Sequence, residues 1–241
     1  MPLMIRAAKD KAEAEVFIYD DIGASWWGDG VTAKGFAANL KALGSPNRIT
    51  VRINSGGGDM FDGLAIYNTL RGHPAHKVVQ VDGLAASAAS FIAMAGDEIL
   101  MGVGTFMMIH NARMVAVGEA SDMRRAADLL DSASGQIANI YASRTGRSTA
   151  EIKRMMDAET WMEPDAALRE GFADGISEGE VMALAASIRV PGARNLPAPL
   201  RAYATNDVID LGAWRRARAH PRAAVTPRLD ALRSRIKLAA R

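Results

Sequence analysis

Short runs of β-branched and other apolar residues alternate with stretches of helical periodicity over the first 180 residues, and this alternation limits the fold more than any other feature. Expected helices at 32–43, 61–72 and 86–96 separate the runs, and a longer one at 119–144 follows the last of them. Strands that alternate with helices favour a largely parallel sheet, so the sequence predicts an α/β fold. The expected strands are EVFIYD (15–20), ITVRI (49–53), KVVQVDG (77–83), EILM (98–101) and TFMMIH (105–110).

The composition is that of a chain with a substantial hydrophobic core, since 49% of its 241 residues are hydrophobic and 23% are charged. No apolar run reaches the roughly 20 residues that a membrane-spanning helix needs. The charged N-terminus does not resemble a secretory signal, so we expect a cytoplasmic protein without membrane contact. Cysteine is absent, which excludes thiolate nucleophiles, disulfides and cysteine-bound zinc.

Basic residues gather at the C-terminal end. Residues 181–241 contain 12 Lys and Arg but 3 Asp and Glu, a net charge of +9; the whole chain carries +2, so residues 1–180 carry −7. We therefore expect a leader at 1–14, a domain at 15–180, and a Pro-containing linker with a basic tail at 181–241. Such a tail suits either a solvated extension or an arm for an acidic partner. Its few aromatic residues argue against a nucleic-acid-binding module.

The segment GLAASAASFIAMAG places Ser87 where an expected strand gives way to a helix. A side chain at such a junction projects from the sheet edge, and the N–H groups that follow it can stabilise a developing oxyanion. That arrangement suits a nucleophilic serine. A tightly packed helix would have the same composition, so the segment alone leaves both interpretations open. Ser90 falls inside the helix, where a packed hydroxyl is expected.

A nucleophilic serine needs a base, and the chain has four histidines. His73 and His76 flank a proline in a polar turn, and His220 lies in the basic tail. His110 differs because it closes an apolar strand and faces the loop that follows. By elimination His110 is the candidate base, with a structural histidine as the alternative.

Three successive glycines follow an expected strand in INSGGGDMF, beginning at Ile53. Glycine permits positive φ and close backbone approach, so N–H groups of this loop can point into a site. The loop lacks the Lys-Ser/Thr of a nucleotide P-loop and does not match GxGxxG, which argues against nucleotide binding.

The order INSGGG, GLAASAAS, MMIHNA and then a Gly-Phe-Ala-Asp segment resembles the proteolytic subunit of the Clp protease family, serine peptidases with the crotonase-like fold. The resemblance covers roughly residues 15–178, and Gly56 stands where the family has proline. It implies repeated ββα units with a long oligomerisation helix, Ser87 as nucleophile and His110 as general base. It implies no metal and no cofactor.

The same resemblance implies an oxyanion hole formed by the N–H groups of Gly58 and Ala88, with polypeptide substrate bound beside Gly57, Met108 and Asn111. The remaining triad member is a carboxylate that orients the base. Alignment without gaps back from the Gly-Phe-Ala-Asp segment brings Glu159 onto the family's aspartate position. Glutamate is one methylene longer than aspartate, so Asp157 stays the alternative. These residues follow from the resemblance and not from spacing alone.

The resemblance also implies a ring-shaped homo-oligomer, with the helix at 119–144 packed between subunits. A core-facing helix is the alternative use of its apolar stripe, which comprises Met123, Ala127, Leu130, Ile137 and Tyr141. The stretches GASWWGDG and DAETW look like the Clp-like proteases of bacteriophages and prophages that mature capsid precursors. The partner would then be a capsid or scaffold protein, and the location the host cytoplasm or the procapsid.

Other function classes stay open at this point. The runner-up is the proteolytic subunit of an ATP-dependent protease that works with an ATP-driven unfoldase, although the short leader shows no motif of the segment that engages one. The crotonase-like fold also houses acyl-CoA enzymes, in which paired N–H groups polarise a thioester without a serine nucleophile. The co-occurrence of Ser87 and His110 argues against that class. An inactive ring that serves as a scaffold is the non-enzymatic alternative.

Overall fold

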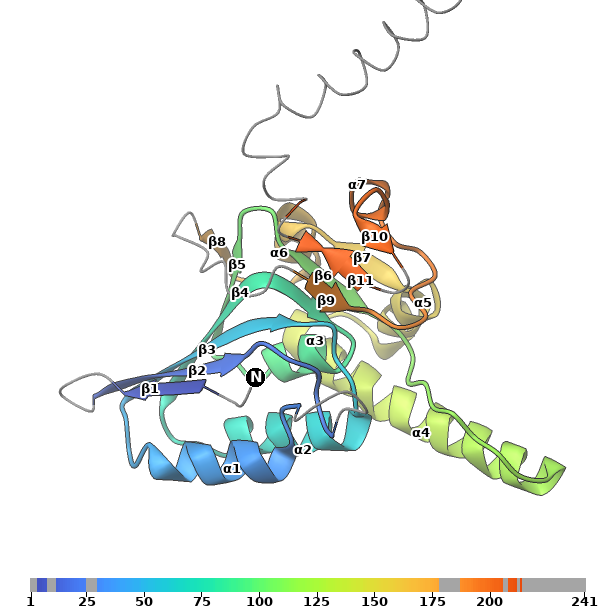
Figure 1. Ribbon diagram of the computed structural model, residues 1–241, viewed down its shortest axis with the longest axis horizontal. Helices are drawn as coiled ribbons and strands as arrows, with labels where there is room; N and C mark the ends of the chain where they lie inside the picture. Colours follow the sequence, from blue (N-terminus) through green and yellow to red (C-terminus); the bar gives the residue numbers. More distant parts are fainter. Residues whose placement is uncertain are drawn as a thin grey trace, which may run out of the picture.

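The computed structural model describes residues 4–7, 12–24, 30–177, 187–205, 208–211 and 213. Within these residues, an eight-stranded sheet with the order β1-β2-β3-β4-β5-β8 forms the centre of the molecule, and β6 joins β4 to β7 at one end (Figure 1). Parallel pairing links β2, β3, β4, β5 and β8 in succession, which confirms the predicted α/β fold. The strands are β1 (Met4–Ala7), β2 (Glu13–Ile18), β3 (Arg48–Ser55), β4 (His76–Ala86), β5 (Glu98–Gly102), β6 (Phe106–Ile109), β7 (Thr160–Met162) and β8 (Gly175–Ser177).

Helices begin at residues suited to cap them. Thr32, Asp59 and Ser148 each accept a hydrogen bond from the backbone N–H three residues later, which satisfies a donor that the first helical turn leaves free. Two of these helices, α1 and α2, lie along one face of the sheet (Figure 1). The helices of this part are α1 (Ala33–Ala42), α2 (Met60–Arg71), α3 (Ala88–Ala93), α4 (Ala120–Thr145), α5 (Thr149–Asp157) and α6 (Pro164–Glu170).

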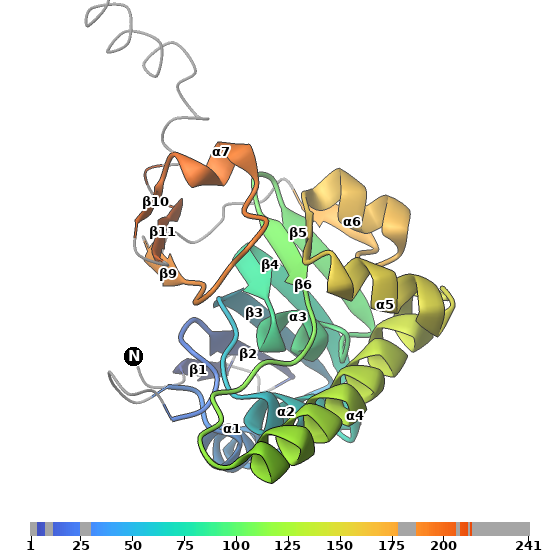
Figure 2. The ribbon, with the colours of Figure 1, turned by 90° about the vertical axis from the view of Figure 1, so that its right-hand side faces the viewer.

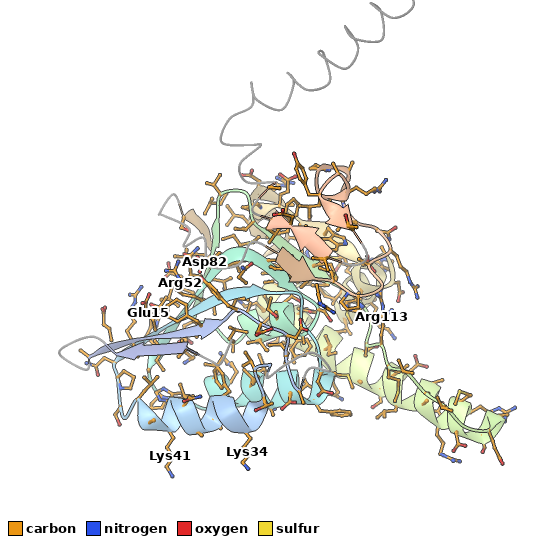
Figure 3. All side chains as sticks on the ribbon, viewed as in Figure 1. Glu15, Lys34, Lys41, Arg52, Asp82 and Arg113 are labelled. Atoms are coloured by element: carbon orange, nitrogen blue, oxygen red, sulfur yellow. The ribbon has the colours of Figure 1, made fainter. Side chains whose placement is uncertain are left out.

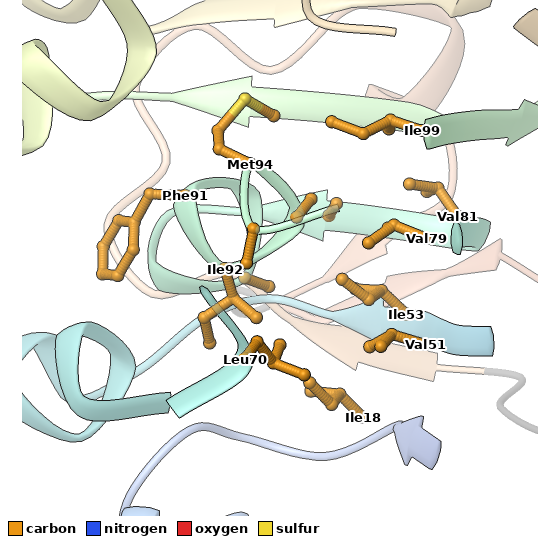
Figure 4. Close-up of a cluster of buried hydrophobic side chains, with 14 of the residues drawn as sticks. Ile18, Val51, Ile53, Leu70, Val79, Val81, Phe91, Ile92, Met94 and Ile99 are labelled. Atoms are coloured by element: carbon orange, nitrogen blue, oxygen red, sulfur yellow. The ribbon is translucent and has the colours of Figure 1, made fainter. Parts of the chain in front are cut away.

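The main core lies between the sheet and these helices. Alternate residues of β2, β3, β4 and β5 point toward α2 and α3 because successive side chains of a strand face opposite sides (Figure 4). Burying each such aliphatic side chain contributes about 1.5–3 kcal/mol. The buried contacts hold the strand ends, where the candidate residues lie, at fixed positions. Side chains in this core include Ile18, Val51, Ile53, Leu70, Val79, Val81, Ile92 and Ile99.

A second, smaller region packs on the opposite face of the sheet, beside β4 and β6 (Figure 2). It contains β9 (Ser187–Arg189), α7 (Ala198–Arg201), β10 (Ala204–Thr205) and β11 (Val208–Asp210), and its three strands form an antiparallel sheet of their own. We refer to residues 187–213 as the C-terminal region. Its buried side chains Ile188, Val190, Leu200, Ile209 and Leu211 cluster with Leu84, Ala86, Phe106 and Met108.

The sequence led us to expect a Pro-containing spacer at these residues, whereas the structure shows a packed region. The packing arises because the apolar side chains of the C-terminal region cover an apolar face of β4 and β6. The boundary near 180 and the basic helix expected beyond residue 213 lie outside the described residues. The leader expected at 1–14 includes β1, which pairs antiparallel with β2.

The long helix α4 divides into a buried and an exposed half. Ile137 and Tyr141 of the expected apolar stripe are buried in the main core. Met123 and Ala127 are exposed, and Leu130 is half-buried. The exposed half extends away from the body of the molecule (Figure 1). A core-facing role therefore accounts for only the second half of the stripe. Within the described residues, no helix is long and apolar enough to cross a membrane.

Candidate active site

Ser87 lies at the turn that joins β4 to α3. Its backbone adopts φ 53° and ψ −123°, a conformation that costs a non-glycine residue about 1–3 kcal/mol and that the surrounding structure must enforce. The Ser87 N–H donates to the carbonyl of Met108 at 3.0 Å, which ties the turn to the neighbouring strand. The turn thus presents the hydroxyl at the sheet edge, and a sharp strand-to-helix turn is one that holds a nucleophilic serine in α/β-hydrolases.

His110 follows the last residue of β6, a parallel neighbour of β4. Ala86 and Met108 are register partners, so the residues beyond these strand ends lie next to each other. The His110 Nε2 atom is 2.7 Å from the Ser87 Oγ atom, a hydrogen bond between residues 23 apart in the chain. The structure therefore brings together the two residues that the sequence singled out on separate grounds.

The environment of His110 favours its neutral form. Burial, followed by the positive charge of Arg113, lowers the pKa of His110 from 6.5 to about 4, although the Glu159 carboxylate acts in the opposite direction. A neutral imidazole can accept a proton from a hydroxyl at its Nε2 atom. At neutral pH this histidine is therefore in the protonation state that a general base requires.

The glycine loop after β3 packs directly against the Ser87 turn. Gly57 has φ 96°, and a Cβ atom there would lie 2.7 Å from the Ser87 Cβ atom and 2.8 Å from the Ala88 nitrogen. No side chain fits so close to that turn, so glycine is required. The Ser55 hydroxyl fixes the loop by accepting from the Gly57 N–H at 3.1 Å.

A cavity of about 170 Å³ opens beside the Ser87–His110 pair. It lies below the roughly 300–1,000 Å³ of sites for drug-sized ligands, so a single side chain fits it better than an acyl-CoA cofactor does. Of the expected binding residues, Met108 and Asn111 line it, as do Gly58 and Ala88, whereas Gly57 packs on the Ser87 turn instead. The remaining lining is mostly apolar and includes Met60, Phe91, Ile137, Tyr141, Val190 and Pro191.

The two candidate acids differ in their surroundings. Asp157 is exposed, and its Oδ1 atom accepts from the Asn111 side chain at 2.7 Å. Glu159 is buried, with 3% of its surface exposed, and lies at a turn with φ 49°. Its Oε2 atom accepts from Arg113 at 2.5 Å, and its Oε1 atom accepts from the backbone N–H groups of Arg194 and Asn195 at 2.6 and 2.8 Å.

These donors leave Glu159 charged. Burial raises the pKa of the Glu159 carboxyl, but the Asn195 N–H, the Arg113 side chain and the Arg194 N–H together outweigh burial and lower it. The structure does not join this carboxylate to His110 by a hydrogen bond. The buried His110 Nδ1 atom has no hydrogen-bond partner within the described residues.

Sequence reasoning missed the partners of Glu159. Arg113 lies three residues after His110 and is labelled in Figure 3, close to the loop that leads into α4. Its spacing from His110 was a usable signal, since both residues follow the same strand end. The two backbone N–H groups carry no such signal, because any residue type supplies them. Ser90 is packed, as expected: its hydroxyl lies 2.6 Å from the Ser87 carbonyl oxygen and 2.7 Å from the Tyr141 hydroxyl.

Comparison with known proteins gives a consistent result. The model of the Clp protease family matches residues 12–180. The ATP-dependent Clp protease proteolytic subunit 1 of Leifsonia xyli subsp. xyli (strain CTCB07) is 31% identical over 150 residues, which span 59% of this chain and 74% of that protein. The ATP-dependent Clp protease proteolytic subunit of Pleurastrum terricola is 33% identical over 126 residues, 52% of this chain and 64% of that protein. The family match spans most of the chain and confirms the resemblance. The chain belongs to the Clp protease family of serine-type peptidases.

Proposed function

We propose that this protein hydrolyses peptide bonds with Ser87 as the nucleophile and His110 as the general base. The observation that carries the proposal is the 2.7 Å contact between the Ser87 Oγ and His110 Nε2 atoms at the mouth of an apolar cavity. His110 takes the hydroxyl proton while Ser87 attacks the carbonyl carbon, and then gives that proton to the leaving amine. Water releases the acyl group by the same route.

The N–H groups of Gly58 and Ala88 are the proposed oxyanion donors. Both residues line the cavity beside Ser87, and Ala88 opens α3, where the first N–H groups have no intrahelical acceptor. Donors fixed at the position of the developing charge are worth about 10²–10³ in turnover each. Glu159 is the proposed acid, because it is buried and acts electrostatically on His110, whereas Asp157 is exposed.

The test is hydrolysis of an unfolded protein by Ser87→Ala, with Ser90→Ala as the matched control. Loss of a triad member lowers turnover by several orders of magnitude, so Ser87→Ala is expected to be inactive. Ser90→Ala keeps the Ser87–His110 pair and is expected to retain most activity. Equal loss in both variants, or activity in Ser87→Ala, contradicts the assignment.

We also propose that the chain works as a homo-oligomeric ring. Exposed apolar side chains support this: Val115 and Val117 are 91% and 93% exposed, and Met114, Met123 and Leu129 lie near them along the loop and the exposed half of α4. Such an apolar surface favours contact with another subunit. A monomer with full activity at micromolar concentration, seen by light scattering, contradicts the ring.

For the substrate we propose a capsid precursor protein, in the host cytoplasm or the procapsid, on the strength of the GASWWGDG and DAETW stretches. The alternative is a substrate delivered by an ATP-driven unfoldase, as the names of both relatives indicate for those proteins. Cleavage of an added capsid precursor without ATP supports the first. Degradation of a stably folded protein only with ATP and an unfoldase supports the second.

A further inference from the structure

The C-terminal region supplies part of the environment of Glu159. The family match ends at residue 180, yet two of the donors to the Glu159 carboxylate are the N–H groups of residues 194 and 195. Two further contacts fix this turn: Arg113 Nη1 donates to the Gly192 carbonyl at 2.7 Å, and the Asn195 side chain donates to the Ala158 carbonyl at 2.6 Å. The turn thus binds both Glu159 and the arginine that pairs with it.

His110 has no hydrogen bond to Glu159, whose carboxylate is bound by the turn instead. The Nδ1 atom of His110 is buried and has no hydrogen bond within the described part of the chain. A buried polar nitrogen without a hydrogen-bond partner is energetically unfavourable, so its isolation calls for an explanation. The Glu159 carboxylate is near enough to act on the His110 charge, but its oxygens face Arg113 and the turn.

The way the region docks depends on glycine at position 56. A Cβ atom on Gly56 would lie 1.7 Å from the Arg189 carbonyl oxygen, so the backbone of β9 fits only because this position of the loop is glycine. From there Val190 and Pro191 continue into the lining of the cavity beside Ser87. The apolar side chains of β9 and β11 anchor the region on β4 and β6.

We propose that the turn at residues 191–195 is an intramolecular latch, which together with Arg113 holds Glu159 away from His110 and keeps the peptidase latent. This inference rests on the proposed function and names the regulation of its site. When the turn leaves, Glu159 loses two N–H donors and keeps Arg113 and the longer, 3.3 Å hydrogen bond from the Trp161 Nε1 atom. Its Oε1 atom can then accept from the His110 Nδ1 atom. The same movement removes Pro191 from the cavity and widens it for substrate.

The test compares two substitutions at one position of the full-length chain. Arg194→Ala and Arg194→Pro both remove the guanidinium, but only proline also removes the N–H that Glu159 accepts. The charge near His110 therefore changes equally in both variants. We expect Arg194→Pro to hydrolyse a small peptide at least about tenfold faster than Arg194→Ala, since an orienting acid is worth up to about 10⁴ in turnover. The gain is expected to vanish when Glu159→Gln is added.

A second readout follows the imidazole itself. In protein labelled with ¹⁵N-histidine, Arg194→Pro is expected to show a low-field Nδ1 proton for His110 that Arg194→Ala lacks. Equal rates and equal spectra in two folded variants overturn the latch. If Arg194→Pro does not fold, the test compares Arg113→Gln with Arg113→Lys, which conserves the charge. A low-field His110 proton in Arg113→Gln alone supports the latch. The absence of that proton from both variants overturns it.

The two readouts separate this inference from the proposed function. A low-field His110 proton in Arg194→Pro, with no hydrolysis by any variant, supports the latch and contradicts the peptidase. Hydrolysis that depends on Ser87 but is equal in Arg194→Ala and Arg194→Pro supports the peptidase and contradicts the latch.

Discussion

Two buried carboxylates, Asp82 and Glu159, are each bound by an arginine, but they connect different parts of the molecule. Asp82 accepts from the Arg52 Nε and Nη2 atoms at 2.8 and 2.7 Å and from the Tyr19 hydroxyl at 2.5 Å. All three residues lie on or directly after neighbouring strands of the main sheet, and Figure 3 shows Arg52 and Asp82 side by side there. Glu159 instead joins the Arg113 loop to the C-terminal region.

The difference shows how the same chemistry serves two purposes. The side chain of Arg52 is 15% exposed and that of Arg113 is 33% exposed, so the first pair is better shielded from water. A pair within one sheet has a single arrangement, and removing one of its partners destabilises the fold. The Glu159–Arg113 pair instead involves the C-terminal region. If that region moves away, the carboxylate of Glu159 can bind a different group. Substitutions of Glu159 are therefore expected to affect mainly catalysis, and substitutions of Asp82 mainly stability.

The largest expected effect is on catalysis, in Glu159→Gln. Glutamine keeps the size of the side chain but cannot stabilise the imidazolium. When it is added to Arg194→Pro, in which Glu159 is free to reach His110, turnover is therefore expected to fall on the order of 10³-fold. In the latched chain the loss is expected to be smaller. Asp82→Asn is the matched control, because it removes a buried carboxylate that has no role in the proposed catalytic mechanism. Peptide hydrolysis normalised to folded protein measures both. A comparable loss in folded Asp82→Asn removes the distinction between the two acids.

A large expected effect on stability belongs to Asp82→Asn. The substitution leaves the half-buried Arg52 guanidinium with only the more distant Glu15 carboxylate, 3.8 Å away, as a counter-charge, which costs about 3 kcal/mol in the free energy of unfolding. Glu159→Gln is expected to cost less, about 1–2 kcal/mol, since water reaches Arg113. Urea denaturation of the two variants gives the comparison. The reverse order contradicts the structural role assigned to Asp82.

A smaller effect is expected from acid. The pKa of His110 is about 4 in the folded chain and 6.5 in the unfolded one, so the unfolded chain binds more protons between these values. The free energy of unfolding therefore falls as pH falls from 6.5 toward 4, by about 2 kcal/mol at pH 5. The lowered pKa of Glu159 affects stability mainly as pH falls through the usual value of 4.5, which is below the pH range from 7 to 5 that is compared.

His110→Asn serves as the control for that titration. It removes the titrating group, so its urea midpoints at pH 7, 6 and 5 are expected to vary less than those of the wild type. An equal pH dependence in both proteins shows that other groups produce it.

The smallest effect is expected at the alternative acid. Asp157 is exposed and bound to Asn111, and exposed polar pairs contribute about 0–1 kcal/mol. Asp157→Asn is expected to keep peptide hydrolysis within about twofold of the wild type and to shift the free energy of unfolding by less than about 1 kcal/mol. A loss of turnover larger than that of Glu159→Gln transfers the role of acid to Asp157.

The sequence predicted the parts of this arrangement that depend on local pattern. The five expected strands correspond to β2 through β6, because each is a compact apolar run between turn or helix signals. The pattern placed Ser87 and His110 each at the end of an expected strand, whereas the pairing of β4 with β6 that makes these ends adjacent is seen only in the structure. The partners of Glu159 were missed because they depend on a contact between residues 35 apart and on backbone N–H groups. The Pro-rich stretch around Arg194 has no helical or strand periodicity, so its packing could be found only from the apolar face that it covers.

The measurement that tests the central claim most directly is mass spectrometry of the protein after treatment with a fluorophosphonate, which reacts with activated serines. The account predicts a single adduct on the peptide that contains Ser87, absent in Ser87→Ala, retained in Ser90→Ala and strongly slowed in His110→Ala. This result follows from the 2.7 Å hydrogen bond between the Ser87 hydroxyl and the His110 imidazole. An adduct on another residue, or one that persists in Ser87→Ala, contradicts the account.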